Sequence, residues 1–389
     1  MIGDLLGSSG VSAAEAGAVF TAMLAGMALS TIIVGRVGER VGRRRLYSYL
    51  FFMLGVTGTL FALTRSIGWL VAAALTGTMS TDPNESGPIT SIEQAMIGEA
   101  PGPVRAGIFG KYNAVAYLAG AAGALAAGGP QALRRFIPAL PANQRFLLIF
   151  PVVGLVCAVL ARRLSPGVEA EGSVAKPAAP PLGESKGVVR RLGALFALDS
   201  FGGGFIVQAF LVYWFRRRFG ASADVMGLVF FVAGLLQAAS SIVAGKLAAK
   251  IGLLNTMVFT HLPSNVLLTL VPFAPSFRAA AALLLARFAL SQMDVPARQA
   301  YVAALVKPSE RTASAAYTNS ARYLARPLGP ALGGALMQAT MVGAPFIAAG
   351  ALKIVYDLAI FRVFRKTPLR PEGPHPPAAA PTVLPVSNT

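Results

Sequence analysis

The stretch GRVGERVGRRR, residues 35–45, decides the fold of this chain. Gly35 and Gly42 stand seven residues apart with an acid between them, and three arginines follow. A long apolar run precedes the stretch, and a second run at 46–63 follows without a single charged residue. Apolar runs on both sides of a compact charged segment indicate a tight connection between two membrane helices, held at the membrane surface by its arginines.

The composition of the whole chain leads to the same conclusion. Of its 389 residues, 55% are hydrophobic and 13% are charged, whereas an ordinary soluble domain is about 25% charged. A soluble enzyme is nearly excluded, and an integral membrane protein is the default. The net charge of +18 can mark a nucleic-acid binder, but the basic residues punctuate apolar runs, so we expect a lipid bilayer and no nucleic acid as partner. One cysteine and two distant histidines argue against a metal site, and we expect no cofactor.

Eleven apolar runs are long enough, at about 20 residues, to cross a bilayer as helices. They are 13–35, 46–63, 69–96, 105–128, 146–161, 193–215, 226–245, 254–274, 279–300, 312–337 and 341–361. A segment rich in proline, alanine and charge follows the fifth run and has no apolar period, which is typical of a linker. We therefore expect an all-α, polytopic membrane helical bundle in four parts. These are an N-terminal bundle at 1–163, a cytoplasmic linker at 164–190, a C-terminal bundle at 191–366 and a disordered cytoplasmic tail at 367–389.

Lysines and arginines divide unequally between the two sets of connections. The set that includes the linker holds 22 of them and the opposite set holds 8, among them Arg216, Arg217 and Arg218. Cytoplasmic loops carry the excess of basic residues in membrane proteins. We therefore expect a multi-pass protein of the cell (inner or plasma) membrane, with the linker and the C-terminus in the cytoplasm.

The two halves of the chain repeat each other. The pattern GRVGERVG at 35–42 returns as GKLAAKIG at 245–252, at an offset of 210. RAGIFGKYNAVAYLAGAAG at 105–123 matches RTASAAYTNSARYLARPLG at 311–329, with arginine, asparagine and tyrosine in one register. Both halves start from the same side of the membrane. This is a parallel repeat about an axis along the membrane normal, a symmetry found in one class of secondary transporters.

The stretch at 35–45 resembles the signature of the major facilitator superfamily between its second and third helices. The residues that carry this resemblance are Gly35, Glu39, Arg40, Gly42, Arg43 and Arg44. The resemblance covers 13–361 and implies two pseudo-symmetric six-helix halves, a monomer, and a role for the stretch in switching between inward-open and outward-open states.

A second motif resembles the antiporter motif of the same family. Its residues are Gly329, Pro330, Gly333 and Gly334. The family carries this motif in its fifth helix, whereas here it lies in the C-terminal half, and the arginine motif of proton antiporters is missing from 76–95. We interpret the glycines as a helix-packing motif and leave antiport open.

Ionisable residues inside membrane runs are costly unless paired or hydrated, so each is a functional hypothesis. Asp82 and Glu85 lie three residues apart on one helical face, and Pro83 between them indicates a kinked or broken helix. We predict that Asp82 or Glu85 carries the coupling charge, as the binding group for a proton or another cation. The alternative is an internal ion pair with a base such as Arg322.

Four further polar residues are assigned to the same coupling and substrate cavity. Asp199 precedes three consecutive glycines, which allow close packing or local unwinding of a helix. Asn113 and Asn319 correspond in the repeat and are expected to hydrogen-bond either substrate or a neighbouring helix. Arg322, an arginine inside a membrane run, needs a carboxylate or an anionic substrate.

These features predict a secondary active transporter of a small solute that works by alternating access. Direct use of ATP is not expected because the chain has no Gly-x-x-x-x-Gly-Lys-Ser/Thr phosphate loop. Protons are then the natural coupling ion, and efflux is one option for direction. No nucleophile and base are arranged as in an enzyme. Two alternatives stay open: a non-transporting membrane sensor or assembly partner, and an inactive truncated transporter.

The start of the chain carries one more prediction. At the offset of 210, Gly10 corresponds to Gly220, so residues 1–10 match only the last turns of the run at 193–215. We therefore expect the first helix of the family to be missing, which leaves helices 2–6 of the family, five in all, in the N-terminal half.

Overall fold

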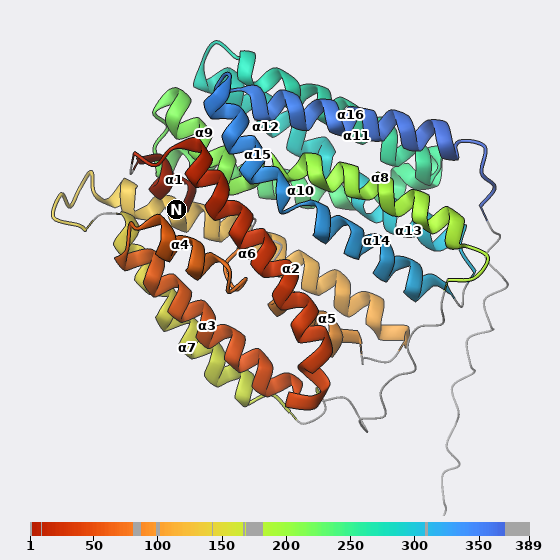
Figure 1. Cartoon of the computed structure of the whole chain (residues 1–389), viewed down its shortest axis with the longest axis horizontal. Coiled ribbons are helices and arrows are strands. Elements are labelled where there is room, and N and C mark those ends of the chain that lie inside the picture. The colour runs from red at the N-terminus through yellow and green to blue at the C-terminus, as the bar shows by residue number, and fades with distance from the viewer. Residues whose placement is uncertain are drawn as a thin grey trace, which may run out of the picture.

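The computed structural model describes residues 2–8, 10–80, 87–98, 102–141, 143–165, 168, 182–307 and 310–369 (Figure 1). The first half of the chain forms α1 (Ile2–Ser8), α2 (Ala13–Val41), α3 (Arg43–Leu63), α4 (Ile67–Ala74), α5 (Pro88–Gly98), α6 (Gly102–Leu133), η1 (Asn143–Leu148) and α7 (Ile149–Arg162). The second half forms α8 (Lys186–Gly204), α9 (Gln208–Phe219), α10 (Ala223–Ile251), α11 (Leu253–Leu270), η3 (Val271–Phe273), α12 (Phe277–Ser291), α13 (Asp294–Leu305), α14 (Arg311–Ala325), α15 (Leu328–Ala339) and α16 (Ala344–Phe364). Every regular element in the described residues is helical.

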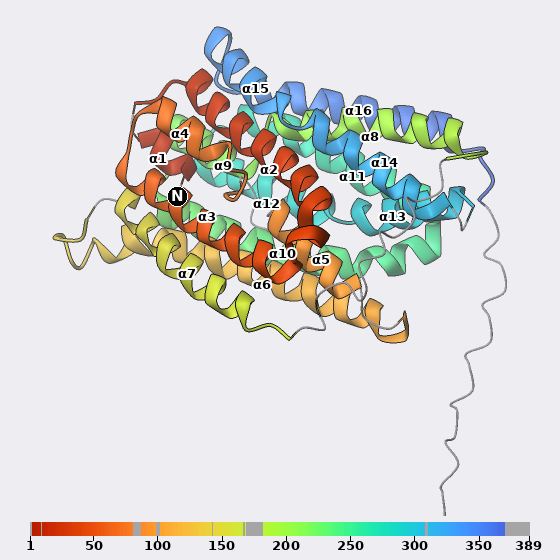
Figure 2. The same ribbon diagram turned by 60° about the horizontal axis from the view of Figure 1, so that its bottom comes forward.

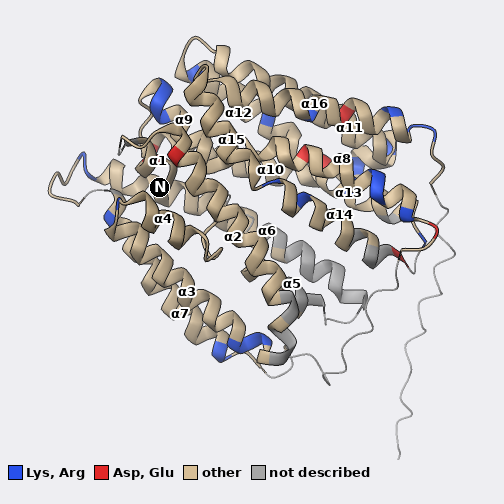
Figure 3. Ribbon diagram, viewed as in Figure 1, with Lys and Arg blue, Asp and Glu red and all other residues tan. Residues whose placement is uncertain are grey.

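The outer surface of this bundle is apolar. Within the described residues, seven helical stretches are long and apolar enough to cross a membrane. Side chains such as Ile33, Val152 and Ile242 point outward and are 57%, 62% and 71% exposed. Lysines and arginines gather at the ends of the helices (Figure 3). Backbone polar groups in lipid must be hydrogen-bonded within the protein, and a helix achieves this within its own segment. The predicted all-α, polytopic membrane bundle is confirmed.

Four of the runs expected as single helices are pairs of shorter helices. The run 69–96 contains α4 and α5, and the run 193–215 contains α8 and α9. The runs 279–300 and 312–337 likewise divide into α12 with α13 and α14 with α15. The last break has a clear local cause, because Pro327 has no N–H to continue the hydrogen-bond ladder of α14.

The backbone repeats at the offset of 210 that the sequence predicts. The bounds of α2 and α10 differ by this offset at both ends. Each of these helices is followed by a glycine of positive φ, 91° at Gly42 and 86° at Gly252. The turns before them contain Gly10 and Gly220, with φ values of 75° and 65°. Side chains rarely adopt these backbone conformations, so glycine ends the corresponding helices in both halves.

The charged stretch at 35–45 is mostly helical, which corrects the expectation of a loop. α2 continues to Val41, and only Gly42 turns the chain into α3. The side chains of Arg43 and Arg44 donate hydrogen bonds to the carbonyl oxygens of Val168 and Leu164, at 3.4 and 2.7 Å. These two arginines therefore hold the chain after α7 against the start of α3.

The molecule has two ends along its helices. We call the end where α7 stops and α8 starts the linker end, and the opposite end, where α15 stops and α16 starts, the far end. Figures 1 and 2 show the first half, red to yellow, beside the second half, green to blue. α2 packs along α15, which lies at the far end, but has few contacts with α14, which extends to the linker end.

Glycines bring α2 and α15 into backbone contact at the far end. A Cβ atom added to Gly334 would lie 2.1 Å from the carbonyl oxygen of Ala13, and one added to Gly17 would lie 2.3 Å from that of Pro330. Both distances are far below van der Waals contact, so only glycine permits this approach.

Hydrogen bonds and an ion pair seal the same end. Thr21 Oγ1 donates to the carbonyl oxygen of Pro327 at 2.7 Å and accepts from the backbone N–H of Ala331 at 2.9 Å. Arg135, after α6, forms an ion pair with Asp224 at the start of α10. The described polar contacts between the two helical bundles therefore lie toward the far end.

We predict that Gly334→Ala opens the far end. Alanine is favoured over glycine inside a helix by about 1 kcal/mol, but here its methyl group meets the backbone of Ala13. Spin labels on Leu63 and Phe273, two exposed residues at the far end, should therefore move apart in the variant. The measurement is the distance distribution by double electron–electron resonance in nanodiscs.

The matched control is Gly123→Ala in α6, where an added Cβ meets nothing within 4 Å. Both variants are made with Cys157, the single cysteine, replaced by serine. A far-end distance that is the same in Gly334→Ala and Gly123→Ala would contradict the prediction that the added methyl group separates α2 from α15.

Candidate functional site

A cavity of about 410 Å³ lies between the two halves. The first half contributes Met27 and Thr31 from α2 and Tyr117 from α6, and the second contributes residues of α8 and α10–α14, together with Lys353 of α16. Ligand pockets usually enclose about 300–1,000 Å³. The cavity is therefore large enough for a small solute and touches both halves.

Three of the helix breaks reach the cavity wall. Val207 between α8 and α9, Gln292 between α12 and α13, and Pro327 between α14 and α15 all line it. Irregular backbone is tolerated within a membrane protein where it lines a cavity or is buried in protein. The breaks therefore mark the part of the bundle where ligand contacts are expected.

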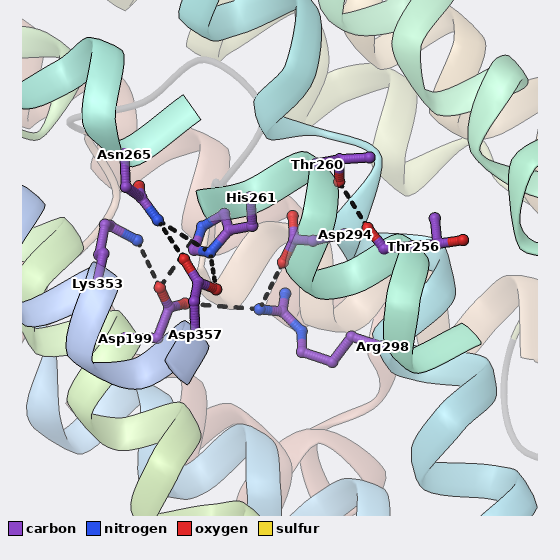
Figure 4. Close-up of polar contacts among 9 residues, drawn as sticks. All are labelled: Asp199, Thr256, Thr260, His261, Asn265, Asp294, Arg298, Lys353 and Asp357. Carbon is purple, nitrogen blue, oxygen red and sulfur yellow. Dashed lines mark hydrogen bonds and ion pairs between the residues drawn. The ribbon is translucent and has the colours of Figure 1, made fainter. Parts of the chain in front are cut away.

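Asp199 of α8 is the centre of a buried ionic network (Figure 4). Its Oδ1 accepts a hydrogen bond from Lys353 Nζ at 2.6 Å and lies 3.7 Å from His261 Nε2. Its Oδ2 lies 3.6 Å from a guanidinium nitrogen of Arg298. One carboxylate thus joins residues of α8, α11, α13 and α16.

Arg298 has a second carboxylate partner. Asp294, one turn earlier on α13, lies 3.2 Å from the same guanidinium nitrogen. The guanidinium carbon also lies 5.5 Å from the ring centroid of Phe196, a cation–π distance. Arg298 is therefore neutralised by two acids and supported by a ring.

His261 connects Asp199 to a third acid. His261 Nδ1 and Asp357 Oδ1 are 2.8 Å apart, and Asn265 Nδ2 donates to Asp357 Oδ2, also at 2.8 Å. When Nδ1–H donates to Asp357, the other ring nitrogen, Nε2, faces Asp199. The imidazole therefore stands between two carboxylates, an arrangement that can hold or pass a proton.

All the charged members of this network are buried. Taking ions out of water costs several kcal/mol each, and the cost is offset only when opposite charges and hydrogen bonds surround them. The network therefore depends on every member being present.

Comparison with known proteins identifies the family. Residues 192–387, half of the chain, match the model of the Major Facilitator Superfamily. The chain belongs to this superfamily. It is therefore a membrane transporter of small solutes and not an enzyme.

Solved structures show that the transporter has the fold of this superfamily along nearly its whole length. It superposes on the nucleoside transporter NupG with a TM-score of 0.70 at 11% identity, covering 93% of each chain. It superposes on the inward-open xylose transporter XylE of E. coli with a TM-score of 0.66 at 16% identity, covering 90% of this chain and 86% of XylE. A Saccharomyces cerevisiae membrane protein, YJR124C, described as uncharacterized, is 26% identical over 376 residues, 88% of this chain and 84% of its own.

Two of the cavity residues predicted from the sequence lie in the wall of the transporter's cavity. They are Asp199 and Arg322. Asn319 is exposed on α14 and is not among the lining residues. Asp82 and Glu85 lie outside the described residues, as do the side chains of Asn113, Gly35, Glu39 and Arg40.

The helix-packing motif in α15 is buried at all four positions. Gly329 and Gly204 cross so closely that a Cβ on Gly329 would lie 2.4 Å from the carbonyl carbon of Gly204. Gly333 packs on Phe205 and Gly334 on Ala13. The motif therefore contacts α8 on one side and the first half on the other.

Sequence reasoning missed Lys353 and Asp357. Both lie in the run 341–361, and each taken singly carried no information about function. Their spacing of four residues was the available signal, because it places both on one face of a helix. An acid and a base on one face inside a membrane indicate an inward-facing polar stripe.

We predict that Asp199→Asn lowers the free energy of unfolding by about 3–5 kcal/mol, since it leaves buried cations without their carboxylate. Adding Lys353→Met should recover part of this loss, because Arg298 then keeps Asp294 as its partner. Unfolding of the purified protein in detergent measures both.

The control is Glu184→Gln, which breaks the exposed pair of Glu184 with Lys307 and should cost no more than about 1 kcal/mol. Losses that simply add in the double variant would show that Asp199 and Lys353 are not coupled.

Proposed function

We propose that this transporter is a secondary active carrier of a small solute that works by alternating access, its halves rocking about the cavity. The observation that carries the proposal is a charged cavity between the halves whose far end is closed by glycine-mediated backbone contact. A contact made by glycines and single hydrogen bonds can separate without exposing buried charge. It is therefore suited to opening and closing.

We assign the linker end to the cytoplasm. The support is the excess of lysine and arginine in the connections that the sequence assigns to that side, 22 against 8. Because the two halves meet at the far end, the state described here is then inward-facing. The C-terminal end of α16 lies on the same side in this assignment.

We propose protons as the coupling ion and efflux as the direction to test first. Asp82 and Glu85 remain the sequence-based candidates, and Gly87, two residues after Glu85, lines the cavity. The pair of His261 and Asp357, beside Asp199, is a second place where a proton could be held. Protonation at either place would change the charge facing the cavity and thereby the balance between the two states.

The repeat also relates α1 to an element of the second half. α1 packs against α9, the element that the repeat assigns to it. In the second half, α8 precedes α9.

We predict that the linker end and the far end move in opposite directions. Val41 and Ile251 end α2 and α10 at the linker end and are 46% and 40% exposed, so both accept spin labels. Gly334→Ala, which opens the far end, should shorten the Val41–Ile251 distance. The same resonance measurement in nanodiscs tests this.

A linker-end distance that does not respond when the far end opens would overturn alternating access. It would favour the non-transporting sensor or the inactive transporter. Gly123→Ala again serves as the variant that changes neither end.

We predict that acidification shifts the wild-type distance populations and that Asp82→Asn or Glu85→Gln removes this shift, since an amide cannot take up the proton. The readout is the Val41–Ile251 distance between pH 5 and pH 8, the range in which buried carboxyl groups and histidines titrate. Glu184→Gln, an exposed acid near the linker end, should leave the shift intact.

Retention of the full pH response by both amide variants would exclude Asp82 and Glu85 as the coupling groups. The same measurement on Asp357→Asn would then test the second proton site.

A further inference from the structure

Bases outnumber acids among the described residues that line the cavity. Among the described lining residues, two are acidic, Asp199 and Asp294. Five are basic: Arg287, Arg298, Arg322, Arg326 and Lys353. The two acids are already engaged, because Lys353 and Arg298 lie against them. Among the described lining residues, Arg322 is the base considered further, because no described acid lies against it.

Arg322 of α14 lacks a described acid at ion-pair distance. No described carboxylate lies within 4.0 Å of its side chain, and its buried Nε has no hydrogen-bond partner. Asp199 and Asp294 attract it from farther away, while Arg298 repels it. Ser200 donates to its backbone carbonyl at 3.0 Å and leaves the guanidinium unengaged.

The position of Arg322 directs this charge at the cavity. It lines the wall one turn before the break at Arg326 and Pro327, and Tyr323 beside it also lines the wall. A guanidinium in a site screened from bulk water is stabilised by a bidentate partner such as a carboxylate or a phosphate. An anion in the cavity would supply such a partner to Arg322.

Aromatic and apolar groups surround the rest of the space. Tyr117 and Tyr323, equivalent in the repeat, both line the cavity, and Phe288 and Met27 join them. Such rings bind the apolar body of a ligand, while polar groups fix its orientation. A ligand with an anionic head and an apolar body satisfies both parts of the wall.

We propose that the cavity takes a small organic anion, and that Arg322 pairs with its carboxylate or phosphate group. This inference rests on the proposed function and names the substrate class of the same cavity. A cationic solute would be repelled by the Arg322 guanidinium, and a neutral one would give it no charged partner at hydrogen-bond distance.

The test compares four probes of similar shape: benzoate, phenylphosphonate, benzylammonium and benzyl alcohol. Their binding to the purified full-length protein in detergent is measured by calorimetric titration at low salt. At least one of the two anions should bind about tenfold or more tightly than benzyl alcohol, since a charge-assisted bidentate pair is worth at least one such factor. Benzoate against phenylphosphonate distinguishes a carboxylate from a phosphate site.

Arg322→Gln should abolish the preference for the anion over benzyl alcohol. Arg278→Gln, which removes one exposed arginine at the start of α12, should leave it unchanged. If Arg322→Gln does not elute as a single folded species, Arg322→Lys replaces it. The lysine keeps the charge but cannot make the bidentate contact of a guanidinium, so anion binding should be weaker than in wild type.

The proposal is overturned if benzylammonium or benzyl alcohol binds as tightly as both anions, or if neither anion binds. It is also overturned if folded Arg322→Gln, or folded Arg322→Lys, binds anions as wild type does. Failure here is distinct from failure of the transporter assignment, because the distances at the two ends report alternating access without any ligand.

Discussion

A carboxylate inside a membrane bundle must be surrounded by cations, and Asp199 meets this constraint by joining four helices. Lys353, His261 and Arg298 approach it from α16, α11 and α13. Removing it would leave Lys353 without its hydrogen-bonded carboxylate, whereas Arg298 and His261 would keep Asp294 and Asp357. The inner face of the second half is therefore held together by charge as much as by apolar packing, and its helices cannot separate without exposing ions to lipid.

The contact between the two halves has the opposite character. Gly17 and Gly334 let α2 and α15 touch through their backbones, and Thr21 adds two hydrogen bonds across the contact. Neutral groups of this kind lose little when they part. The second half has a charge-bound interior and meets the first half mainly through neutral, glycine-rich contacts, with the exposed Arg135 paired to Asp224 at the same end. This division of forces suits the rocking mechanism proposed above.

The repeat preserves backbone geometry but not charge. Gly42 and Gly252 make the same turn after helices of the same length. In the first half, however, the carboxylate of Glu93 accepts hydrogen bonds from the hydroxyl groups of Tyr47 and Tyr112, both at 2.6 Å. In the second half, Arg298 belongs instead to the ionic network around Asp199. Among the described residues, the network around Asp199 is confined to the second half, so the cavity presents chemically different walls to a solute.

The sequence by itself determined the helical character, the approximate limits of the membrane runs and the register of the repeat. These follow from local composition, from the length needed to cross a bilayer and from glycines that only special backbone angles explain. It also identified Asp199 and Arg322 as costly charges. Which charges neutralise one another was decided by tertiary structure, because Lys353 and His261 are brought to Asp199 only when α8, α11 and α16 pack together. The same packing leaves Arg322 without a described carboxylate. Local patterns cannot specify such pairings, because the energy of a buried ion depends on neighbours that are distant in the chain.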